Sequence, residues 1–229
     1  MRVSTDMIEK RNTEFAKKKP ITFGGLDLSH AQVSSTEFKY SKGAEIFGDK
    51  EPANYIYQVI KGAVRSHKLL SDGRRQIGAF HLPGDIFGLE NSDLHRFTAE
   101  AIAPTTVRFV KRLSLESAVD CDPAMGRALL TMTAQNLQHV ENHMLLLGRK
   151  NSQERVAAFL LEMNGRVSGP GVVALPMSRG DIADYLGLRL ETVSRALSGF
   201  KRKGYLEFLD TRQRQIVVLN AAGLTELDQ

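Results

Sequence analysis

A group of polar and charged residues near the C-terminus has the side-chain types that bind DNA. The group contains arginine, glutamate, threonine, serine and lysine in close succession, at Arg189, Glu191, Thr192, Ser194, Arg195 and Lys201. Such side chains form hydrogen bonds with base edges and phosphate oxygens in the major groove. The sequence therefore predicts that this segment contacts double-stranded DNA.

The residues around this polar group have the pattern of two helices joined by a sharp turn. Ser178, followed three residues later by Asp181, forms a loose capping box and predicts that a first helix begins there. Gly187 lies where a tight turn between helices needs a permissive backbone. The second helix has apolar residues at spacings of three and four, namely Leu190, Val193, Ala196, Leu197 and Phe200. Together these features favour a helix-turn-helix over a surface helical hairpin with solvated charges.

The expected DNA contacts fall into two sets. We predict that the bases are contacted by Leu190, Glu191, Ser194 and Arg195. We predict that the phosphate backbone is contacted by Ser178, Arg189, Thr192 and Lys201. Arg195 can bind a guanine with two hydrogen bonds, and Glu191 can accept one from an amino group of cytosine or adenine.

Composition limits the classes of protein that this chain can belong to. The 229 residues suit two modest domains or one large one, and the formal charge of +5 permits nucleic-acid binding. Cys121 is the single cysteine, so an internal disulfide and a cysteine-held iron–sulfur cluster are excluded. We expect its thiol to be inert, with a redox role as the alternative. Without a signal-peptide pattern or a run of 18 apolar residues, the chain is expected to be cytoplasmic and to make no membrane contact.

The N-terminal half has the sequence pattern of an antiparallel β domain. Short apolar runs alternate with glycine and turn residues, at 46–47, 55–60, 63–70, 76–82, 86–87, 98–102 and 106–110. This spacing predicts a β-roll or jelly roll. Asp72 and Gly73 predict a hairpin turn because both residues tolerate positive φ. The polar tip of this hairpin is expected to project, with Asp72, Gly73, Arg74 and Arg75.

A long helix with a heptad pattern is expected after the β domain. Two sets of residues seven apart form a seam, with Leu130, Leu137 and Met144 offset by three from Thr133, Val140 and Leu147. The narrow strip predicts a coiled-coil homodimer, and packing of the helix on its own β domain is the alternative. His139 and His143 lie four apart, but no carboxylate or thiol triad accompanies them. We therefore expect interfacial or solvated histidines and no metal site.

The predicted fold is α+β. Its expected parts are an N-terminal arm at 1–21, the β domain at 22–120, the dimerisation helix and joint at 121–150, and a winged helix-turn-helix at 151–229. A new helix is expected to begin at Asn151 or Ser152. The wing is predicted as a β-hairpin, with Leu206–Phe208 and Gln215–Leu219 flanking a polar turn. A last short helix is expected over 221–227.

This order of parts resembles the CRP/FNR superfamily of bacterial transcription regulators. The segment Glu191–Arg195 resembles the Glu-x-x-Ser-Arg recognition motif of the FNR branch, and Pro83–Gly88 and Leu147–Val156 also resemble family segments. The chain is most similar to FixK-type members, which lack the cysteine cluster of FNR. The resemblance implies an activator that binds a TTGA…TCAA-type palindrome and touches RNA polymerase through the hairpin tip.

The usual effectors of this superfamily are not expected here. Members that bind cyclic AMP carry an Arg-Ser or Arg-Thr pair, whereas here Phe97 separates Arg96 from Thr98. Gly88 is followed by Leu89-Glu90 rather than by a helix start rich in free N–H groups. The resemblance therefore implies a regulator that is active without a cyclic nucleotide or any other cofactor.

Two other interpretations stay open at this point. One is a regulator gated by a cyclic-nucleotide-like ligand or by haem. The other is a jelly-roll metal enzyme with a C-terminal interaction module. The enzyme would need clustered histidines on neighbouring strands, and His67, His81 and His95 are scattered in the sequence.

Overall fold

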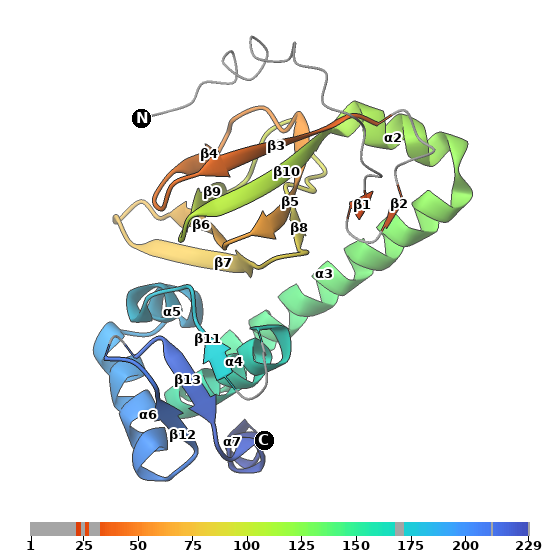
Figure 1. Ribbon diagram of the computed structural model, residues 1–229. Coiled ribbons are helices and arrows are strands. Elements are labelled where there is room, and N and C mark those ends of the chain that lie inside the picture. The colour runs from red at the N-terminus through yellow and green to blue at the C-terminus, as the bar shows by residue number, and fades with distance from the viewer. Residues whose placement is uncertain (1–21, 24–25, 28–32, 168–171, 212, 229) are drawn as a thin grey trace. The chain divides into compact units, whose positions relative to one another are not determined.

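The computed structural model describes residues 22–23, 26–27, 33–167, 172–211 and 213–228, so the N-terminal arm predicted over 1–21 lies outside the described residues. The chain forms two compact units (Figure 1). One unit contains the chain as far as Ser66 together with Phe80–Thr131. The other contains His67–Ala79 and the chain from Met132 onward.

The β domain consists mainly of two antiparallel four-stranded sheets, which confirms the predicted class (Figure 1). One sheet has the order β3–β10–β5–β8, with β3 at Ser35–Tyr40, β10 at Thr105–Lys111, β5 at Tyr55–Lys61 and β8 at Ile86–Phe87. The other has the order β4–β9–β6–β7, with β4 at Glu45–Phe47, β9 at Thr98–Ala101, β6 at Val64–Leu69 and β7 at Arg75–His81. A short pair, β1 (Thr22–Phe23) and β2 (Leu26–Asp27), precedes them.

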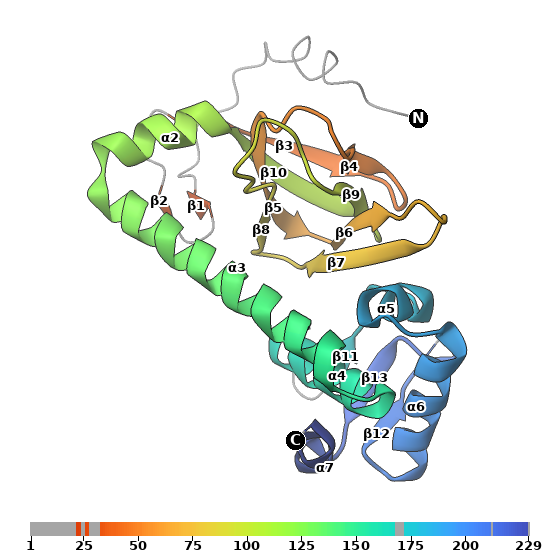
Figure 2. The ribbon, with the colours of Figure 1, turned by 180° about the vertical axis from the view of Figure 1, so that it is seen from behind.

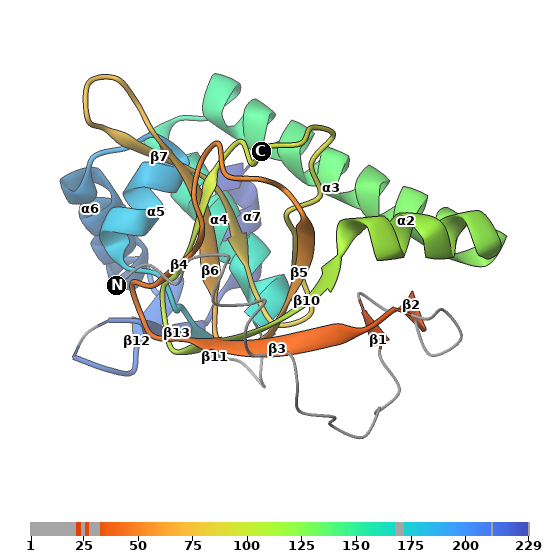
Figure 3. The same ribbon diagram turned by 90° about the horizontal axis from the view of Figure 1, so that it is seen from above.

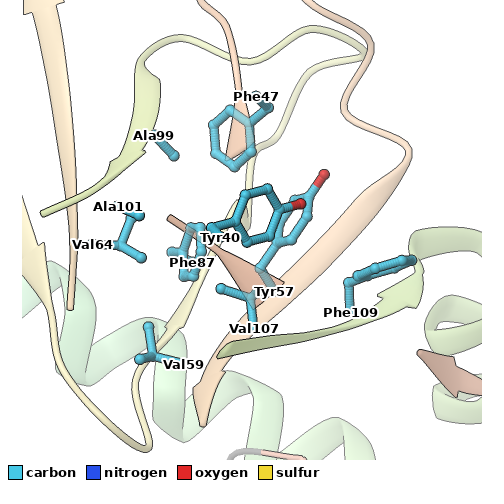
Figure 4. Packing of buried hydrophobic residues seen from close by; sticks show 10 residues of the cluster. All are labelled: Tyr40, Phe47, Tyr57, Val59, Val64, Phe87, Ala99, Ala101, Val107 and Phe109. Carbon is cyan, nitrogen blue, oxygen red and sulfur yellow. The ribbon is translucent and has the colours of Figure 1, made fainter. Parts of the chain in front are cut away.

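Strand β10 is central because it pairs on both sides. Its Val107 lies opposite Phe38 of β3 and opposite Val59 of β5. The side chains of this sheet pack with those of the other sheet in a core rich in aromatic rings, shown in Figure 4. The core residues are Tyr40, Phe47, Tyr57, Val59, Val64, Phe87, Ala99, Ala101, Val107 and Phe109.

Gly62 permits a close approach of two chain segments in this domain. Its φ is +92°, and a Cβ at this position would lie 2.5 Å from the carbonyl oxygen of Pro104 and from Oγ1 of Thr105. Thr105 uses that hydroxyl to donate to the carbonyl oxygen of Ala63 and to accept from the N–H of Ala63. A side chain at position 62 would push this hydrogen-bonded turn apart.

Two helices follow the β domain, and the sequence pattern had indicated only the second. Helix α2 spans Arg112–Cys121 and buries Leu115 and Ala118. Helix α3 spans Pro123–Arg149, close to the bounds predicted for the long helix, and it runs from the first unit into the second (Figure 2). Cys121 is the last residue of α2 and is exposed.

The second unit contains the C-terminal elements (Figure 3). Its helices are α4 (Ser152–Val167), α5 (Arg179–Leu186), α6 (Leu190–Arg202) and α7 (Ala221–Asp228). Its sheet has the order β11–β13–β12, with β11 at Val172–Ala174, β13 at Gln215–Val218 and β12 at Leu206–Phe208. The predicted wing hairpin is therefore part of a three-stranded sheet. Its added strand, β11, pairs with β13 and was not among the predicted elements.

The β6–β7 hairpin turns at the predicted place with a different geometry. The N–H of Leu70 donates to the carbonyl oxygen of Arg74, and the N–H of Gly73 donates to that of Leu70. Gly73 has a φ of +82°, whereas Asp72 does not take a positive φ. The predicted hairpin turn is therefore confirmed, but the loop is one residue wider than a two-residue turn, so Gly73 takes a positive φ and Asp72 does not.

Candidate nucleic-acid interface

The start of α5 is fixed by the capping box that the sequence predicts. The hydroxyl oxygen of Ser178 accepts from the N–H of Asp181 at 3.1 Å and donates to its carboxylate at 2.7 Å. The same carboxylate accepts from the N–H of Ser178 at 2.9 Å. The single hydroxyl proton of Ser178 is thus used inside the helix cap. Phosphate contact by Ser178 stays a prediction and requires this hydroxyl to change its partner.

The turn between α5 and α6 depends on Gly187. This residue ends α5 in the left-handed conformation, with φ 61° and ψ 38°, and its N–H donates to the carbonyl oxygen of Ala183. Arg189 then adopts an extended conformation as the N-cap of α6, and its carbonyl oxygen accepts from Thr192 and Val193. The predicted helix, glycine turn and second helix are confirmed (Figure 2).

Helix α6 separates apolar and polar side chains cleanly. Its buried residues are Val193, Ala196, Leu197 and Phe200. Leu190 was expected in this stripe, but it is 47% exposed because it lies at the first position of the helix. The predicted base-contacting residues Glu191 and Arg195 are exposed on the outer face, and Thr192 and Ser194 are half-buried beside them.

Lys201 has a partner within the wing. Its Nζ lies 2.6 Å from the carboxylate of Glu207 and 5.7 Å from the ring centroid of Phe208. The hydrogen bond from Lys201 lowers the pKa of the Glu207 carboxyl. Because Lys201 is exposed, a phosphate could replace Glu207 as its partner. Its predicted contact with the DNA backbone stays a prediction.

Arg179 connects three parts of the winged helix-turn-helix, and the sequence pattern did not indicate this. It is the first residue of α5, and its Nη1 donates to the hydroxyl of Ser194 at 3.2 Å. Its Nη2 donates to the side-chain oxygen of Gln213, in the turn between β12 and β13. The guanidinium carbon lies 5.7 Å from the ring centroid of Phe208.

A basic groove lies between the start of α4 and one side of α6. Its volume is about 500 Å³. It is lined by Ser152, Gln153, Thr192, Arg195, Ala196, Gly199, Arg202 and Lys203. Three cationic side chains next to a helix N-terminus favour an anion such as a DNA phosphate. The basic run Lys201–Lys203 was a signal for this groove, but the contribution of α4 was not visible in the sequence.

The joint between α3 and α4 is held by Arg155. Its guanidinium donates to the carbonyl oxygens of Leu147 and Lys150 at 2.9 Å each, and to that of Leu186 at 3.0 Å. Asn151 caps α4 by accepting from the N–H groups of Gln153 and Glu154. One side chain of α4 therefore satisfies carbonyl groups at the ends of α3 and α5.

Along α3, the predicted seam is exposed in the single chain. Leu130 is 70% exposed and Met144 is 64% exposed, and Leu137, Val140 and Thr133 are exposed as well. Leu147 is half-buried. Leu145 is also exposed, although it lies outside the heptad positions. Exposed apolar side chains in one stripe of a long helix are typical of a surface that pairs with another chain.

The hairpin tip holds the four residues predicted for polymerase contact, in two different environments. Arg74 is exposed and lies 2.7 Å from the carboxylate of Asp72, and hydrogen bonds from Arg74 lower the pKa of Asp72. Arg75 was expected to project beside it, but it does not. Its guanidinium lies 2.9 Å from Asp181 and 2.7 Å from Asp184, both on α5.

His139 and His143 line a cavity of about 390 Å³ together with Tyr185, Lys150 and Glu162. The ring centroids of His143 and Tyr185 lie 4.1 Å apart. Burial, with a smaller effect from His139, lowers the pKa of His143 to about 4. Within the described ranges, no group of three or more His, Cys, Asp and Glu residues could hold a metal ion.

The loop after Gly88 in the β domain is organised by a carboxylate. Glu90 accepts from the backbone N–H of Arg96 at 2.9 Å and lies 3.3 Å from Nδ1 of His95. His95 is buried and its ring stacks on Phe47, with centroids 3.6 Å apart. The carboxylate of Glu90 therefore binds the backbone N–H of Arg96 within its own loop, and no helix lies between Gly88 and Thr98.

Comparisons with known proteins identify both domains. The family model of the cyclic nucleotide-binding domain matches residues 37–121, and that of the Crp-like helix-turn-helix domain matches residues 154–227. The nitrogen fixation regulation protein FixK of Azorhizobium caulinodans is 42% identical over 82% of this chain and 77% of its own length. FixK of Rhizobium meliloti is 41% identical over 88% of this chain and 93% of its own length.

A solved structure is similar in both sequence and fold. It is that of FixK2 from Bradyrhizobium japonicum, with a TM-score of 0.83 and 61% sequence identity. The match covers 86% of this chain and 98% of the FixK2 chain. In the described part of the chain, none of the helices has the length and apolar character needed to cross a bilayer.

Proposed function

Because this chain belongs to the CRP/FNR family of transcription regulators, we propose that it binds a TTGA…TCAA-type palindrome as a homodimer and activates transcription without a small-molecule effector. The half-site follows from the resemblance of Glu191–Arg195 to the recognition motif of the FNR branch. Two relatives are named as regulators of nitrogen fixation, so promoters of that process are the first targets to test.

The observation that carries the DNA-binding proposal is the exposed face of α6. Glu191 and Arg195 lie one turn apart on this face, and the opposite face is anchored in the core by Val193, Leu197 and Phe200. A helix of this kind can enter the major groove with its N-terminal residues against the bases. The basic groove between α4 and α6 would then accept the phosphate backbone beside it.

The exposed stripe of α3 supports the homodimer. Its leucine, valine and methionine side chains would be removed from water by the same stripe of a second copy. A palindrome presents two identical half-sites, and a two-fold dimer presents two identical recognition helices. Dimerisation and palindromic binding therefore follow from the same symmetry.

The β domain supports independence from a cyclic nucleotide. The phosphate of such a ligand is an anion, and the loop after Gly88 holds the carboxylate of Glu90 on the backbone of Arg96. The guanidinium of Arg65 binds the carboxylate of Glu100 at 2.8 Å and 2.9 Å. An anionic ligand would meet the negative charge of Glu90 in this loop and would have to displace Glu100 from Arg65, so its binding would be disfavoured.

We test the base-contacting role with Arg195→Ala. Loss of a bidentate contact to guanine should cost ~1–3 kcal/mol of binding free energy on the matched site. Fluorescence anisotropy with the palindrome and with a site changed at that base pair measures both affinity and selectivity. The wild type should discriminate between the two sites and the variant should discriminate much less. Full affinity together with full discrimination in the variant would show that Arg195 does not contact that base.

A further inference from the structure

The guanidinium of Arg179 joins the recognition helix to the wing. One of its nitrogens donates to the hydroxyl of Ser194 on α6, at 3.2 Å. The other donates to the side-chain oxygen of Gln213, which lies between β12 and β13. The ring of Phe208, on β12, lies 5.7 Å from the guanidinium carbon. A planar fork with fixed donor directions can hold two acceptors in one relative position.

The contact with Arg179 also restricts what Ser194 can do. A guanidinium can only donate hydrogen bonds, so the oxygen of Ser194 must act as the acceptor in this pair. The hydroxyl proton of Ser194 is then directed away from the cation. A further donor that approached the same oxygen would meet the positive charge of Arg179. Ser194 is therefore set to donate its proton to an outside acceptor.

We propose that Arg179 is a positioning residue that presents Ser194 to the DNA as a hydrogen-bond donor and couples the wing to the recognition helix. This inference rests on the proposed contact of Ser194 with a base. In the major groove, the acceptors are N7 and O6 of guanine, N7 of adenine and O4 of thymine. We therefore expect Ser194 to favour a base that has an acceptor at the contacted position. Cytosine should be disfavoured there, because its N4 is a donor.

The wing contributes through Gln213. This residue takes a left-handed conformation, with φ 54°, and its N–H donates to the carbonyl oxygen of Asp210 at 3.0 Å. The carboxylate of Asp210 accepts from the N–H groups of Arg214 at 2.7 Å and Gln215 at 2.9 Å. The turn therefore has a defined shape, and it places the amide oxygen of Gln213 where Arg179 binds it.

The test is a binding selection from DNA with one randomised half-site. It uses the full-length wild type, Arg179→Met, Arg179→Lys, Ser194→Ala and the double variant Arg179→Met/Ser194→Ala. Ser194→Ala should relax the preference at one base pair by about two- to tenfold, the range of a single hydrogen bond. Arg179→Met should relax the same base pair, and the double variant should show little further loss, since the two residues act as one unit.

Arg179→Lys keeps the charge but removes the fork. It should retain more affinity than Arg179→Met and still lose preference at that base pair. Preference equal to that of the wild type in Arg179→Lys would overturn the positioning role. Gln213→Ala changes only an exposed turn residue, so it keeps the proposal testable if the Arg179 variants fail to fold. It should relax the same base pair in part, and an unchanged preference there would overturn the coupling to the wing.

The matched control is Arg202→Met, which removes one positive charge from the basic groove between α4 and α6. It should weaken all sequences alike and lower the salt dependence of binding by about one phosphate contact. If Arg179→Met gave this same uniform result, Arg179 would be a phosphate ligand. The positioning role would then be wrong, while the proposed function would be unaffected. If the wild type selected no sequence, the proposed function itself would fail.

Discussion

At the scale of single residues, we expect His143 to make the stability of the fold depend on pH. Its ring nitrogens are shielded from solvent, and its ring packs on Tyr185 beside His139, Lys150 and Glu162. The pKa is about 4 in the folded chain, against an ordinary value of 6.5. Below about pH 6.5 the unfolded chain binds a proton that the folded chain rejects until about pH 4. Stability from this group should fall as the pH falls through that window.

We expect the free energy of unfolding to decrease as the pH is lowered from 7 to 5. His143→Phe should make this dependence on pH less steep. Phenylalanine keeps an aromatic ring next to Tyr185 but cannot titrate. Urea unfolding at a series of pH values measures the slope for both proteins. Some slope should remain in the variant because burial also lowers the pKa of His95. Equal slopes in the two proteins would rule out a contribution from His143.

For single residues, contacts between near neighbours in the sequence could be predicted, and contacts between distant residues could not. The capping box of Ser178 and Asp181 and the left-handed Gly187 were predictable because they depend on neighbours within a few positions. The contacts of Arg179 were not, because Ser194 and Gln213 are 15 and 34 positions away. Arg75 shows the same limit, since its partners Asp184 and Asp181 are 109 and 106 positions away.

At the scale of elements, α3 carries the dimer proposal. Leu137→Glu would place a carboxylate in the seam of each chain, where two-fold symmetry brings the two charges into one desolvated interface. We expect the variant to be monomeric and to bind the palindrome weakly, as measured by sedimentation velocity and anisotropy. Gln138→Glu is the matched control, because it adds the same charge to the same helix at an exposed position outside the seam. A stable dimer of Leu137→Glu would exclude this seam.

The β6–β7 hairpin carries the proposed contact with RNA polymerase. Arg74→Glu reverses an exposed charge that pairs with Asp72 within the same turn. Transcription in vitro should fall while DNA affinity stays unchanged, because the residue is expected to face the polymerase. Arg75→Glu is the contrasting variant. It would face the carboxylates of Asp181 and Asp184 and should weaken DNA binding as well, since Asp181 caps α5. Unchanged transcription by Arg74→Glu would leave this tip without a polymerase role.

Elements with strong patterns were predictable, and those with weak patterns were not. Alternation and turn residues indicated β5, β6, β7 and β10, and the heptad repeat indicated α3. Strand β3, with the sequence STEFKY, is largely exposed and polar, so it had no apolar run to mark it. Helix α2 buries only Leu115 and Ala118 and was therefore too weakly patterned. Both depend on β10, which pairs with β3 and immediately precedes α2.

At the scale of the whole molecule, the fold of a ligand-binding family is combined with a core of packed aromatic side chains. The β domain matches the cyclic nucleotide-binding family over residues 37–121. Its core packs Phe47, Tyr57 and Phe87 with ring centroids between 5.1 and 6.0 Å apart (Figure 4). A family fold thus identifies the ancestry of the domain, whereas the residues in it decide whether a ligand is bound.

A ligand shifts a conformational equilibrium only through different affinities for the two states. Since we propose that this protein needs no effector, we expect the DNA-competent state to dominate in the proposed dimer when no ligand is bound. Dialysed protein should bind its palindrome and drive transcription with bacterial polymerase when no small molecule is added. The measurement is single-round transcription in air and under reductant, with Cys121→Ser as the control because it removes the single thiol. Equal output from both proteins under both conditions supports a constitutive regulator. An inactive wild type that a cyclic nucleotide, haem or a metal ion then activates would mean that the protein has an effector site and would overturn the proposal of effector independence.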